Sequence, residues 1–293
     1  MSCLEILATG PLATIQDLGR PGLAGIGVGR SGAADAGSFR LANRLVGNDE
    51  GAAAIEVTFG GLAVRATRDL TAAVTGAPCP ITVDGRAAAV NSVLRIPAGA
   101  ELRMGVPGCG LRSYLAVRGG VAVPPVLGSR ATDVLAGVGP EPLAGGAVLP
   151  VGPPPDRFPQ VDVAPVAVCP ADEIVLSVAP GPRHDWFVDD ALATLVSKPY
   201  EVTADSNRIG MRLDGPALDR SRTEELPSEG MVAGALQVPP SARPTLFLAD
   251  HPVTGGYPVI AVVAAADLDA AAQARPGQRI RFRLKKGFRT RLS

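Results

Sequence analysis

The feature that most constrains the fold of this chain is the regular interruption of short apolar runs by glycine, proline and asparagine. The first half contains the runs LEIL, AAIEVTF, LAVRA, LTAAVTG, PITVDG, SVLRIPAG, AELRMGV and RSYLAVRGG, and the second half EIVLSVAPGP, YEVTA, GMRLDGP, TLFLAD, YPVIAVV and QRIRFRL. Such runs are typical of the strands of a barrel or sandwich. Although 35 residues are glycine and 28 are proline, 46% are hydrophobic, which indicates a folded, turn-rich β protein.

Helices are expected in only three places. The first begins after Asp35 as its N-cap and ends at Gly47 as a left-handed stop. Its apolar stripe consists of Phe39, Ala42, Leu45 and Val46. The second covers residues 184–198 before Pro199 and carries the stripe Phe187, Ala191, Leu195 and Val196. The third is short and is capped by Asp267.

The length of 293 residues is sufficient for two domains. A proline-rich stretch with little apolar periodicity covers residues 148–170, so we expect the boundary near residue 158. The segments RIPAGAELRMG and QARPGQRIRFR both place a turn before an alternating strand, which hints at duplicated halves, although common turn sequences explain the similarity almost as well. The prediction is a mainly β chain with a few helices, in two halves at 1–158 and 159–293.

Several function classes are excluded by charge and composition. Basic and acidic residues number 28 each and no basic run exceeds LKK, so we expect no nucleic-acid partner. MSCLEILATG has no basic n-region and carries Glu5, so we expect no signal peptide, and the longest apolar run is too short to span a membrane. The four cysteines form no C-x-x-C pair and no disulfide framework, which favours a reducing, cytoplasmic setting. With His184 and His251 as the only histidines, no metal site is expected.

A glycine-rich stretch, GRPGLAGIGVGRSGAAD at residues 19–35, first suggests a phosphate-binding loop. No Gly-Lys-Ser/Thr follows the glycines, so the lysine and the hydroxyl of a P-loop are missing. The preceding TIQDLGRPG is polar and turn-like, whereas a dinucleotide fingerprint needs a buried strand there. Both nucleotide-binding interpretations are therefore rejected.

Two polar clusters with arginine are candidate sites. The first contains Gln16, Asp17, Arg20 and Asp35 around the glycine-rich stretch, where the two aspartates are equally well explained as caps of turns. The second lies in TADSNRIGMRLDG, where Ser206 and Arg208 precede an alternating strand. A β-turn with a locally paired arginine explains this cluster as well as a ligand site does.

Two further clusters lie closer to the C-terminus. In LPSEGMVAGALQVPP, Glu229 precedes small residues, and Gln237 lies in an apolar strand where a polar amide needs a partner. In LADHPVTGGYPVIAVV, a strand ends at Asp250, and His251, Thr254 and Tyr257 surround a Gly-Gly turn. An ordinary hairpin explains that turn, but it does not require an acid, a histidine and a hydroxyl together.

Several of these motifs together resemble one known family. TIQDLGRPG, GVGRSGAAD, SFRLANRLVGN, DSNRIGMRLDGP, SEGMVAGALQVPP and LADHPVTGGYP occur in this order along the chain. They resemble the allophanate hydrolase subunit 2 family, also called the biotin-dependent carboxyltransferase family, which includes the C-type subunit of 5-oxoprolinase. The resemblance implies two cyclophilin-like β-barrel halves. It also implies a heteromeric complex with a protein that is similar to allophanate hydrolase subunit 1, the B-type component of 5-oxoprolinase.

The resemblance leaves three functions open. Members similar to the 5-oxoprolinase component act with a B-type partner and a third lactam-utilisation subunit in ATP-dependent opening of 5-oxoproline to glutamate. Fused relatives form the carboxyltransferase part of urea carboxylase, with carboxybiotin as cofactor. Other relatives resemble non-catalytic regulatory binding subunits. Lys198, Lys285 and Lys286 do not lie in a biotin-carrier hairpin, so we expect no covalent biotin on this chain.

We favour the hydrolase of a cyclic amide, with ATP as a substrate of the complex. Phosphate activation of the lactam oxygen followed by water attack overcomes amide resonance. The substrate carboxylate needs a cation, either Arg208 or Arg20, and the ring needs an acid or base. The predicted catalytic residues are Asp250, His251, Glu229 and Arg208. The predicted substrate-binding residues are Gln16, Asp17, Arg20, Asp35, Ser206, Gln237, Thr254 and Tyr257.

Overall fold

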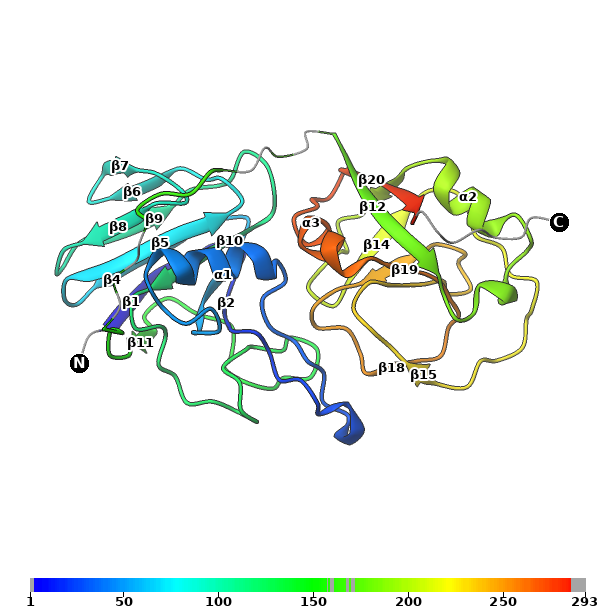
Figure 1. Ribbon diagram of the computed structural model, residues 1–293, viewed down its shortest axis with the longest axis horizontal. Coiled ribbons are helices and arrows are strands. Elements are labelled where there is room, and N and C mark those ends of the chain that lie inside the picture. Colours follow the sequence, from blue (N-terminus) through cyan, green and yellow to red (C-terminus); the bar gives the residue numbers. More distant parts are fainter. Residues whose placement is uncertain (1–2, 157, 159–160, 167–168, 170–171, 286–293) are drawn as a thin grey trace. The chain divides into compact units, whose positions relative to one another are not determined.

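The computed structural model describes residues 3–156, 158, 161–166, 169 and 172–285, which leaves Lys286 outside the described residues. The chain forms two compact units (Figure 1). Unit 1 comprises Met1–Pro21 and Ser31–Cys169, and unit 2 comprises Gly22–Arg30 and Pro170–Ser293. The proline-rich stretch suggested a boundary near residue 158. Residues after that position still contact unit 1, since Ser92 forms a β-bridge with Val163 and Asn91 Nδ2 donates to the Pro165 carbonyl.

Unit 1 contains two antiparallel sheets that enclose an apolar core. The first sheet has the order β11 (Val148–Pro150), β1 (Cys3–Thr9), β4 (Leu62–Ala66), β9 (Glu101–Met104), β6 (Ile81–Val83) and β7 (Arg86–Ala88). The second has the order β2 (Leu12–Gln16), β3 (Ala54–Thr58), β10 (Arg112–Val117), β5 (Leu70–Gly76) and β8 (Val93–Ile96). In β10, Leu115 and Val117 face the core between the sheets, whereas Tyr114 and Ala116 face the opposite side.

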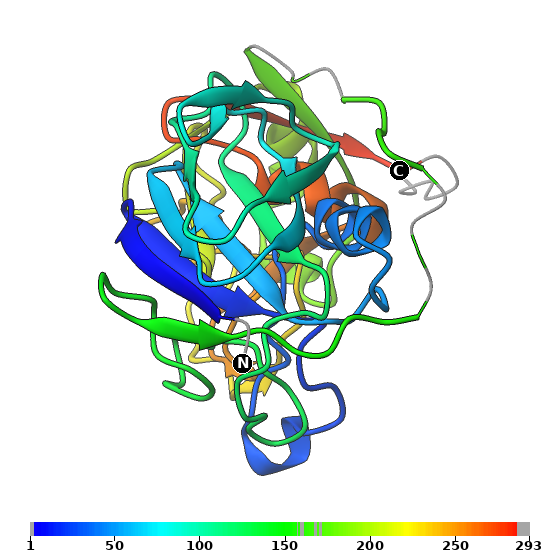
Figure 2. The same ribbon diagram turned by 90° about the vertical axis from the view of Figure 1, so that its left-hand side faces the viewer.

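Helix α1 (Ala36–Leu45) covers that opposite side of the five-stranded sheet, packing on β5 and β10 (Figure 2). All four residues of its expected apolar stripe are fully buried. Asp35 caps the helix through a 2.9 Å hydrogen bond from the Ser38 N–H, and Gly47 follows it with a positive φ of 71°. The predicted helix and both of its end signals are confirmed.

Strand β2 contradicts the interpretation of TIQDLGRPG as turn-like. Ala13 and Ile15 face the core, and Thr14 and Gln16 on the other face are also buried. The outer edge of β2 receives hydrogen bonds from the Thr132 and Leu143 N–H groups, so a segment distant in sequence covers a polar strand. Because β2 pairs antiparallel with β3, the rejection of a dinucleotide-binding βαβ unit still holds.

Unit 2 contains a closed seven-stranded barrel, so the mainly β class with a few helices is confirmed. The barrel order is β12 (Glu173–Pro180), β19 (Val259–Val263), β16 (Ala235–Gln237), β17 (Thr245–Phe247), β14 (Gly210–Asp214), β13 (Tyr200–Val202) and β20 (Arg279–Leu284). Strands β12 and β20 are parallel, and the other barrel pairs are antiparallel. Outside the barrel, β15 (Glu229–Gly230) pairs with β18 (Thr254–Gly255).

The two helices expected in the second half of the chain are shorter than predicted, and unit 2 contains five short helical segments among the described residues. They are η1 (Ala24–Ile26), η2 (His184–Trp186), α2 (Ala191–Ser197), η3 (Ala265–Asp267) and α3 (Leu268–Ala272). The predicted second helix is divided because Phe187 is extended, with φ −109° and ψ 164°. The Asp267 carboxylate does not cap α3; it accepts a 2.6 Å hydrogen bond from the Ser177 N–H instead. Within the described ranges, no helix is both long and apolar enough to cross a membrane.

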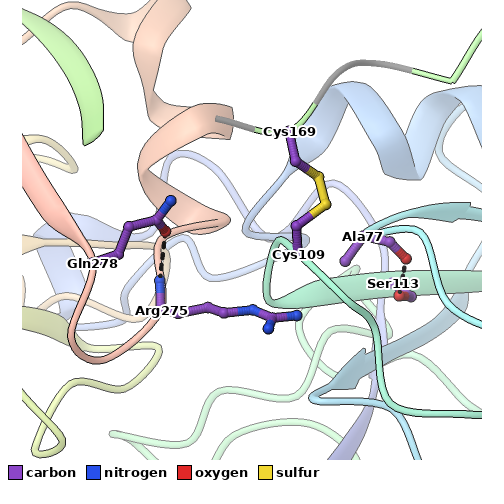
Figure 3. Close-up of a disulfide and its surroundings, with 6 residues drawn as sticks. All are labelled: Ala77, Cys109, Ser113, Cys169, Arg275 and Gln278. Atoms are coloured by element: carbon purple, nitrogen blue, oxygen red, sulfur yellow. Dashed lines mark hydrogen bonds between the residues drawn. A yellow bond between two sulfur atoms is a disulfide. The ribbon is translucent and has the colours of Figure 1, made fainter. Parts of the chain in front are cut away.

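Cys109 and Cys169 form a disulfide within unit 1, a pair that the sequence had not indicated (Figure 3). The two residues are 60 positions apart, so their spacing gave no indication of a pair. Close by, the Ser113 hydroxyl donates a 2.8 Å hydrogen bond to the Ala77 carbonyl (Figure 3). Since stable disulfides are rare in reducing compartments, the cysteines no longer support the cytoplasmic setting, which stays a prediction.

Tyr200 predicts how the stability of unit 2 depends on alkaline pH. It is fully buried beside Phe282, and its hydroxyl has no hydrogen-bond partner among the described residues. Burial raises its pKa from 10.0 to about 12. The unfolded chain releases this proton near pH 10 and the folded chain near pH 12, so the free energy of unfolding should fall by about 2–3 kcal/mol across that window.

The substitution Tyr200→Phe should leave the free energy of unfolding at pH 7 unchanged or raised and should remove this alkaline loss. Urea unfolding at pH 7 and pH 12, monitored by circular dichroism, measures both effects. Tyr257→Phe is the matched control, because Tyr257 is 43% exposed. An equal alkaline loss in Tyr200→Phe and the parent chain would show that Tyr200 does not cause it.

Candidate functional site

In unit 1 the end of β2 holds the segment Ser129–Asp133. Gln16, the last residue of β2, is fully buried, and its Nε2 donates to the Thr132 carbonyl and to Thr14 Oγ1, both at 3.0 Å. The Ser31 hydroxyl donates to the same Thr132 carbonyl at 3.0 Å. The predicted residue Gln16 therefore lies in a buried polar region built from three parts of the chain.

The Asp17 carboxylate has an anchoring role in this region. Its Oδ1 accepts hydrogen bonds from the Gly19 N–H at 2.8 Å and the Ser129 hydroxyl at 2.6 Å. Its Oδ2 accepts a 2.6 Å bond from the Arg130 N–H. Because these three donors occupy both oxygens, the structure favours Asp17 as the residue that positions the 129–133 segment.

Arg20 follows this strand in the sequence and is only 2% exposed. Its Nη2 donates to the Ala131 carbonyl, next to the Thr132 carbonyl that Gln16 and Ser31 bind. Among the described residues, Arg20 Nε and Nη1, Gln16 Oε1 and Thr132 Oγ1 have no hydrogen-bond partner. We call Gln16, Arg20 and Thr132 the Arg20 cluster, because Arg20 and Gln16 donate to the consecutive carbonyls of Ala131 and Thr132. Buried polar atoms without a partner are unusual in a folded protein.

A buried network next to α1 holds Asp35, and the side chains of Tyr114, Glu56 and Arg112 in it had not been predicted. The Asp35 N–H donates to the Tyr114 hydroxyl, which donates to Glu56 Oε2, each bond being 2.8 Å long. Glu56 Oε2 also accepts from the Ala34 N–H, and Glu56 Oε1 lies 3.6 Å from Arg112 Nε. Burial, with a smaller effect of the Glu56 charge, raises the pKa of Tyr114 well above its usual range. This network fixes the start of α1.

In unit 2, Gln237 lies on the outer face of the barrel, as the last residue of β16. Leu236 and Val238 point into the barrel core, while Ala235 packs outside it with Met231, Phe247 and Val259. Gln237 Nε2 donates to the Tyr257 carbonyl at 3.1 Å. As predicted, this buried amide has a hydrogen-bond partner, which is the main-chain carbonyl of Tyr257.

Tyr257 itself is 43% exposed, and its ring lies 5.5 Å from the guanidinium carbon of Arg220. Arg220 also donates to the Val238 carbonyl, and partial burial lowers its pKa. Sequence inspection had not singled out Arg220. Gln237, Tyr257 and Arg220 together provide an amide, an aromatic face and a cation on one side of the barrel.

Glu229 forms an ion pair with Arg183, another residue that had not been predicted. Arg183 Nε donates to Glu229 Oε1 at 2.8 Å, and Nη2 donates to the same oxygen. This hydrogen bond lowers the pKa of Glu229 and raises that of Arg183. A carboxylate with a lowered pKa is a weaker base, so Glu229 is better suited to hold Arg183 in place than to take a proton.

Arg208 lies just before β14, and Asp250 lies just after β17. The two side chains bind each other. Arg208 Nε and Nη2 donate to the two Asp250 oxygens, both at 2.9 Å, and the side chains are 1% and 0% exposed. The Asp250 N–H also donates to the Arg208 carbonyl at 3.0 Å. Because the bidentate pair satisfies its own charges, the geometry favours a structural role over substrate binding.

His251, next to this pair, is half-buried and stacks on Phe247 with ring centroids 6.3 Å apart. Its Nδ1 lies 2.8 Å from the Pro252 carbonyl. A carbonyl can only accept, so Nδ1 carries the proton in the neutral ring and Nε2 is the basic nitrogen. Of the three predicted acids or bases, His251 is therefore the best placed to exchange a proton.

Ser206 and Thr254 have local partners. Ser206 Oγ accepts a 3.1 Å hydrogen bond from the Arg212 N–H, and Asn207 Oδ1 accepts from the Ile209 N–H at 2.8 Å, as in a polar turn. Thr254 is exposed in β18 and pairs with Gly230. Their predicted roles in substrate binding stay predictions, as do those of the other candidate residues. No group of three His, Cys, Asp or Glu side chains in the described part of the chain is arranged to hold a metal ion.

The fold and its polar clusters define a two-unit, mainly β protein whose candidate sites consist of arginine, amide, hydroxyl and carboxylate groups. The profile of the family "Carboxyltransferase domain, subdomain A and B" matches residues 26–284, and the chain belongs to this family.

Similarity to individual proteins extends over nearly the whole chain. The chain is 37% identical to the C subunit of 5-oxoprolinase from Escherichia coli over 95% of this chain and 90% of that protein. It is 32% identical to urea amidolyase of Saccharomyces cerevisiae over 96% of this chain but 16% of that protein. The crystal structure of TTHA0988 superposes with a TM-score of 0.88 at 37% identity, covering 97% of this chain and 56% of that one. The Kluyveromyces lactis urea carboxylase structure gives a TM-score of 0.87 at 31% identity, covering 96% of this chain and 27% of that one.

The buried ion pair predicts a large effect on stability. Asp250→Asn should lower the free energy of unfolding by about 3–5 kcal/mol, because it leaves the Arg208 charge buried without a counter-charge. The double variant Arg208→Met with Asp250→Leu should recover most of this loss. Urea unfolding measures both values.

Asp185→Asn provides the matched control, since Asp185 forms an exposed pair with Arg222. This control should change the free energy of unfolding by less than about 1 kcal/mol. If Asp250→Asn were as stable as the parent chain, the structural role of the pair would be wrong.

Proposed function

We propose that this chain is the C-type subunit of a heteromeric, ATP-dependent 5-oxoprolinase that converts 5-oxoproline to glutamate. The observation that carries the proposal is the match to the Escherichia coli 5-oxoprolinase C subunit over 95% of this chain and 90% of the relative. A second relative of this name, from Haemophilus influenzae, is 33% identical over the same shares. The subunit name of these relatives supports a complex, in which we expect a B-type partner, a third lactam-utilisation subunit and a cytoplasmic setting.

The chemistry requires activation, because amide resonance makes the lactam carbonyl a poor electrophile. In the proposed reaction, the γ-phosphoryl group of ATP moves to the lactam oxygen and ADP leaves. Water then adds to the activated carbon, and the C–N bond opens with a proton delivered to nitrogen, which leaves an acyl phosphate. A second water hydrolyses this acyl phosphate and releases phosphate. The products are glutamate, ADP and phosphate. A neutral imidazole suits the removal of a proton from the attacking water.

Within this proposal His251 is the residue that exchanges the proton, with Nε2 as its basic atom. Phe247 and the Pro252 carbonyl orient the ring, and Asp250 is held away from such chemistry by Arg208. Gln237, Tyr257 and the Arg183–Glu229 pair supply polar groups for substrate binding in the same unit. ATP is a substrate of the complex, and no covalent biotin is expected on this chain.

A second function, transfer of a carboxyl group from carboxybiotin to a urea-like nitrogen, is supported by the family description and by the urea amidolyase relatives. In that case the partner protein would supply carboxybiotin. A regulatory binding subunit without catalysis is the third outcome that the assay below distinguishes.

Reconstitution tests the proposal. The purified chain, its B-type partner and the third subunit should together convert 5-oxoproline and ATP to glutamate, ADP and phosphate, and omission of this chain should abolish glutamate formation. His251→Gln should lower kcat by about 10²–10⁴-fold while the complex still assembles. Lys198→Ala is the control, because Lys198 is exposed outside the candidate sites.

An assembled complex that forms no glutamate would contradict the proposed function. Urea-dependent consumption of carboxybiotin by that complex would favour carboxyl transfer, and assembly without either reaction would favour a regulatory role. Wild-type kcat in His251→Gln would remove His251 from the mechanism without affecting the assignment of the overall reaction.

A further inference from the structure

A groove with a volume of about 490 Å³ lies in unit 1 where the two sheets end at β7 and β8 (Figure 1). Strand β7 is the last strand of the six-stranded sheet, and β8 is the last strand of the five-stranded sheet. The volume is within the range of about 300–1,000 Å³ that is typical of small-molecule sites. We call this space the β7–β8 groove, and its lining residues are Val83, Asp84, Arg86, Ala87, Ala88, Val93, Leu94, Arg95 and Pro97.

The apolar part of the groove continues the core of unit 1. Leu94 is a buried member of that core, and Val83 and Ala88 are half-buried and pack against it. These three side chains come from both sheets, so they border the groove on both sides. A compact apolar body in the groove would cover surface that the protein itself leaves partly open to water, which is favourable.

Arg86 brings a positive charge to this apolar surface. It lies opposite Val83 in the register of β6 and β7, and residues that lie opposite each other share a face of the sheet. Ala88, two positions along the strand, is on the same face. Because Val83 and Ala88 pack against the core, Arg86 starts on the core side of the sheet, yet its side chain is exposed. Arg86 therefore places a solvent-accessible cation beside the apolar wall.

No carboxylate among the described residues forms an ion pair with Arg86. Asp84, the acidic residue of the lining, is held on β9 instead. Its Oδ1 accepts a 2.8 Å hydrogen bond from the Glu101 N–H, and its own N–H donates to the Glu101 carbonyl at 2.9 Å. The guanidinium of Arg86 is therefore available to an anionic ligand.

Arg95, the second arginine of the lining, has a different orientation. Leu94 and Ile96 belong to the core, so strand alternation places Arg95 on the opposite face of β8. Its Nη1 lies 3.5 Å from Thr71 Oγ1 on the neighbouring strand β5. The charge of the groove next to the apolar wall is therefore that of Arg86.

We propose that the β7–β8 groove binds a carboxylate with a compact apolar body, such as a short-chain fatty acid. The body contacts Val83, Ala88 and Leu94, and the carboxylate pairs with Arg86. One arginine matches a single negative charge, whereas a phosphate monoester carries a charge of roughly −1.5 to −2 at neutral pH. Strand β7 is only three residues long and offers few main-chain groups to an added strand, which favours a small molecule over a peptide. The site does not rest on the proposed 5-oxoprolinase reaction.

The binding test uses isothermal titration calorimetry and amide NMR on the purified full chain with hexanoate as the probe. Hexanoate should bind with a Kd of about 1 mM or tighter. It should bind at least about tenfold more tightly than hexanamide, which lacks the charge, and than acetate, which lacks most of the apolar body. The amide shifts that hexanoate changes should centre on residues 83–88 and 93–97.

Arg86→Gln is the most informative variant, because Arg86 is exposed and its replacement should leave the free energy of unfolding nearly unchanged. It should weaken hexanoate binding at least about tenfold and leave hexanamide binding unchanged. Ala88→Leu should weaken both ligands, since the larger side chain takes up space in the groove. Arg65→Gln is the matched control, because Arg65 is an exposed arginine of β4 that does not line the groove.

Hexanoate that binds no more tightly than hexanamide, or that binds Arg86→Gln as tightly as the parent chain, would overturn the site. Shift changes centred outside the groove would overturn it as well. Tighter binding of hexyl phosphate than of hexanoate would show that the carboxylate is the wrong anion. Tighter binding of an extended acidic peptide, Val-Glu-Val-Glu, would replace the small ligand by a strand added at β7.

Discussion

The hydrogen bonds of the Asp17 carboxylate are the interaction on which the candidate binding region of unit 1 depends. They join the end of β2 to Ser129 and Arg130 and thereby place the Ala131 and Thr132 carbonyls against Arg20 and Gln16. A carboxylate that accepts three short hydrogen bonds in a buried place is a rigid support. The geometry of the Arg20 cluster therefore follows from a neighbouring residue that has no free atoms for a ligand.

Both units use a buried amide at the end of a strand. Gln16 ends β2 and Gln237 ends β16, and each lies on the strand face that points away from the main core. In each case Nε2 donates to a carbonyl of a distant segment, that of Thr132 or Tyr257. Because an amide buried without a partner is costly, these glutamines specify which segment covers each strand. They also leave oxygen atoms available for other contacts in these regions.

The arginines of the two units differ in what balances their charge. Arg208 is paired with Asp250, and Arg183 with Glu229, whereas the buried Arg20 side chain has the Ala131 carbonyl as its partner among the described residues. A paired guanidinium holds structure, and a buried unpaired one favours an anionic ligand. The charge balance of each arginine therefore follows from the packing of its own unit.

The sequence by itself determined the secondary structure where local signals were strong. Alternating apolar runs predicted most strands, and Asp35 and Gly47 bounded α1, because period-two hydrophobicity and end caps act within a few residues. Gln237 could be recognised as buried because it interrupts an apolar strand. By the same signal, Glu56 in AAIEVTF and Tyr114 in RSYLAVRGG could have been found.

Only the tertiary structure decided the rest, since it depends on contacts between residues far apart in the sequence. Strand β2 looks like a polar turn until the segment near Thr132 covers it, and Cys109 and Cys169 pair across 60 positions. The local sequence around Arg20 and Arg208 is similarly polar, yet Asp250 neutralises one and no described carboxylate neutralises the other. Which charges lie next to each other in a buried region depends on packing between residues far apart in the sequence, so local sequence patterns do not predict it.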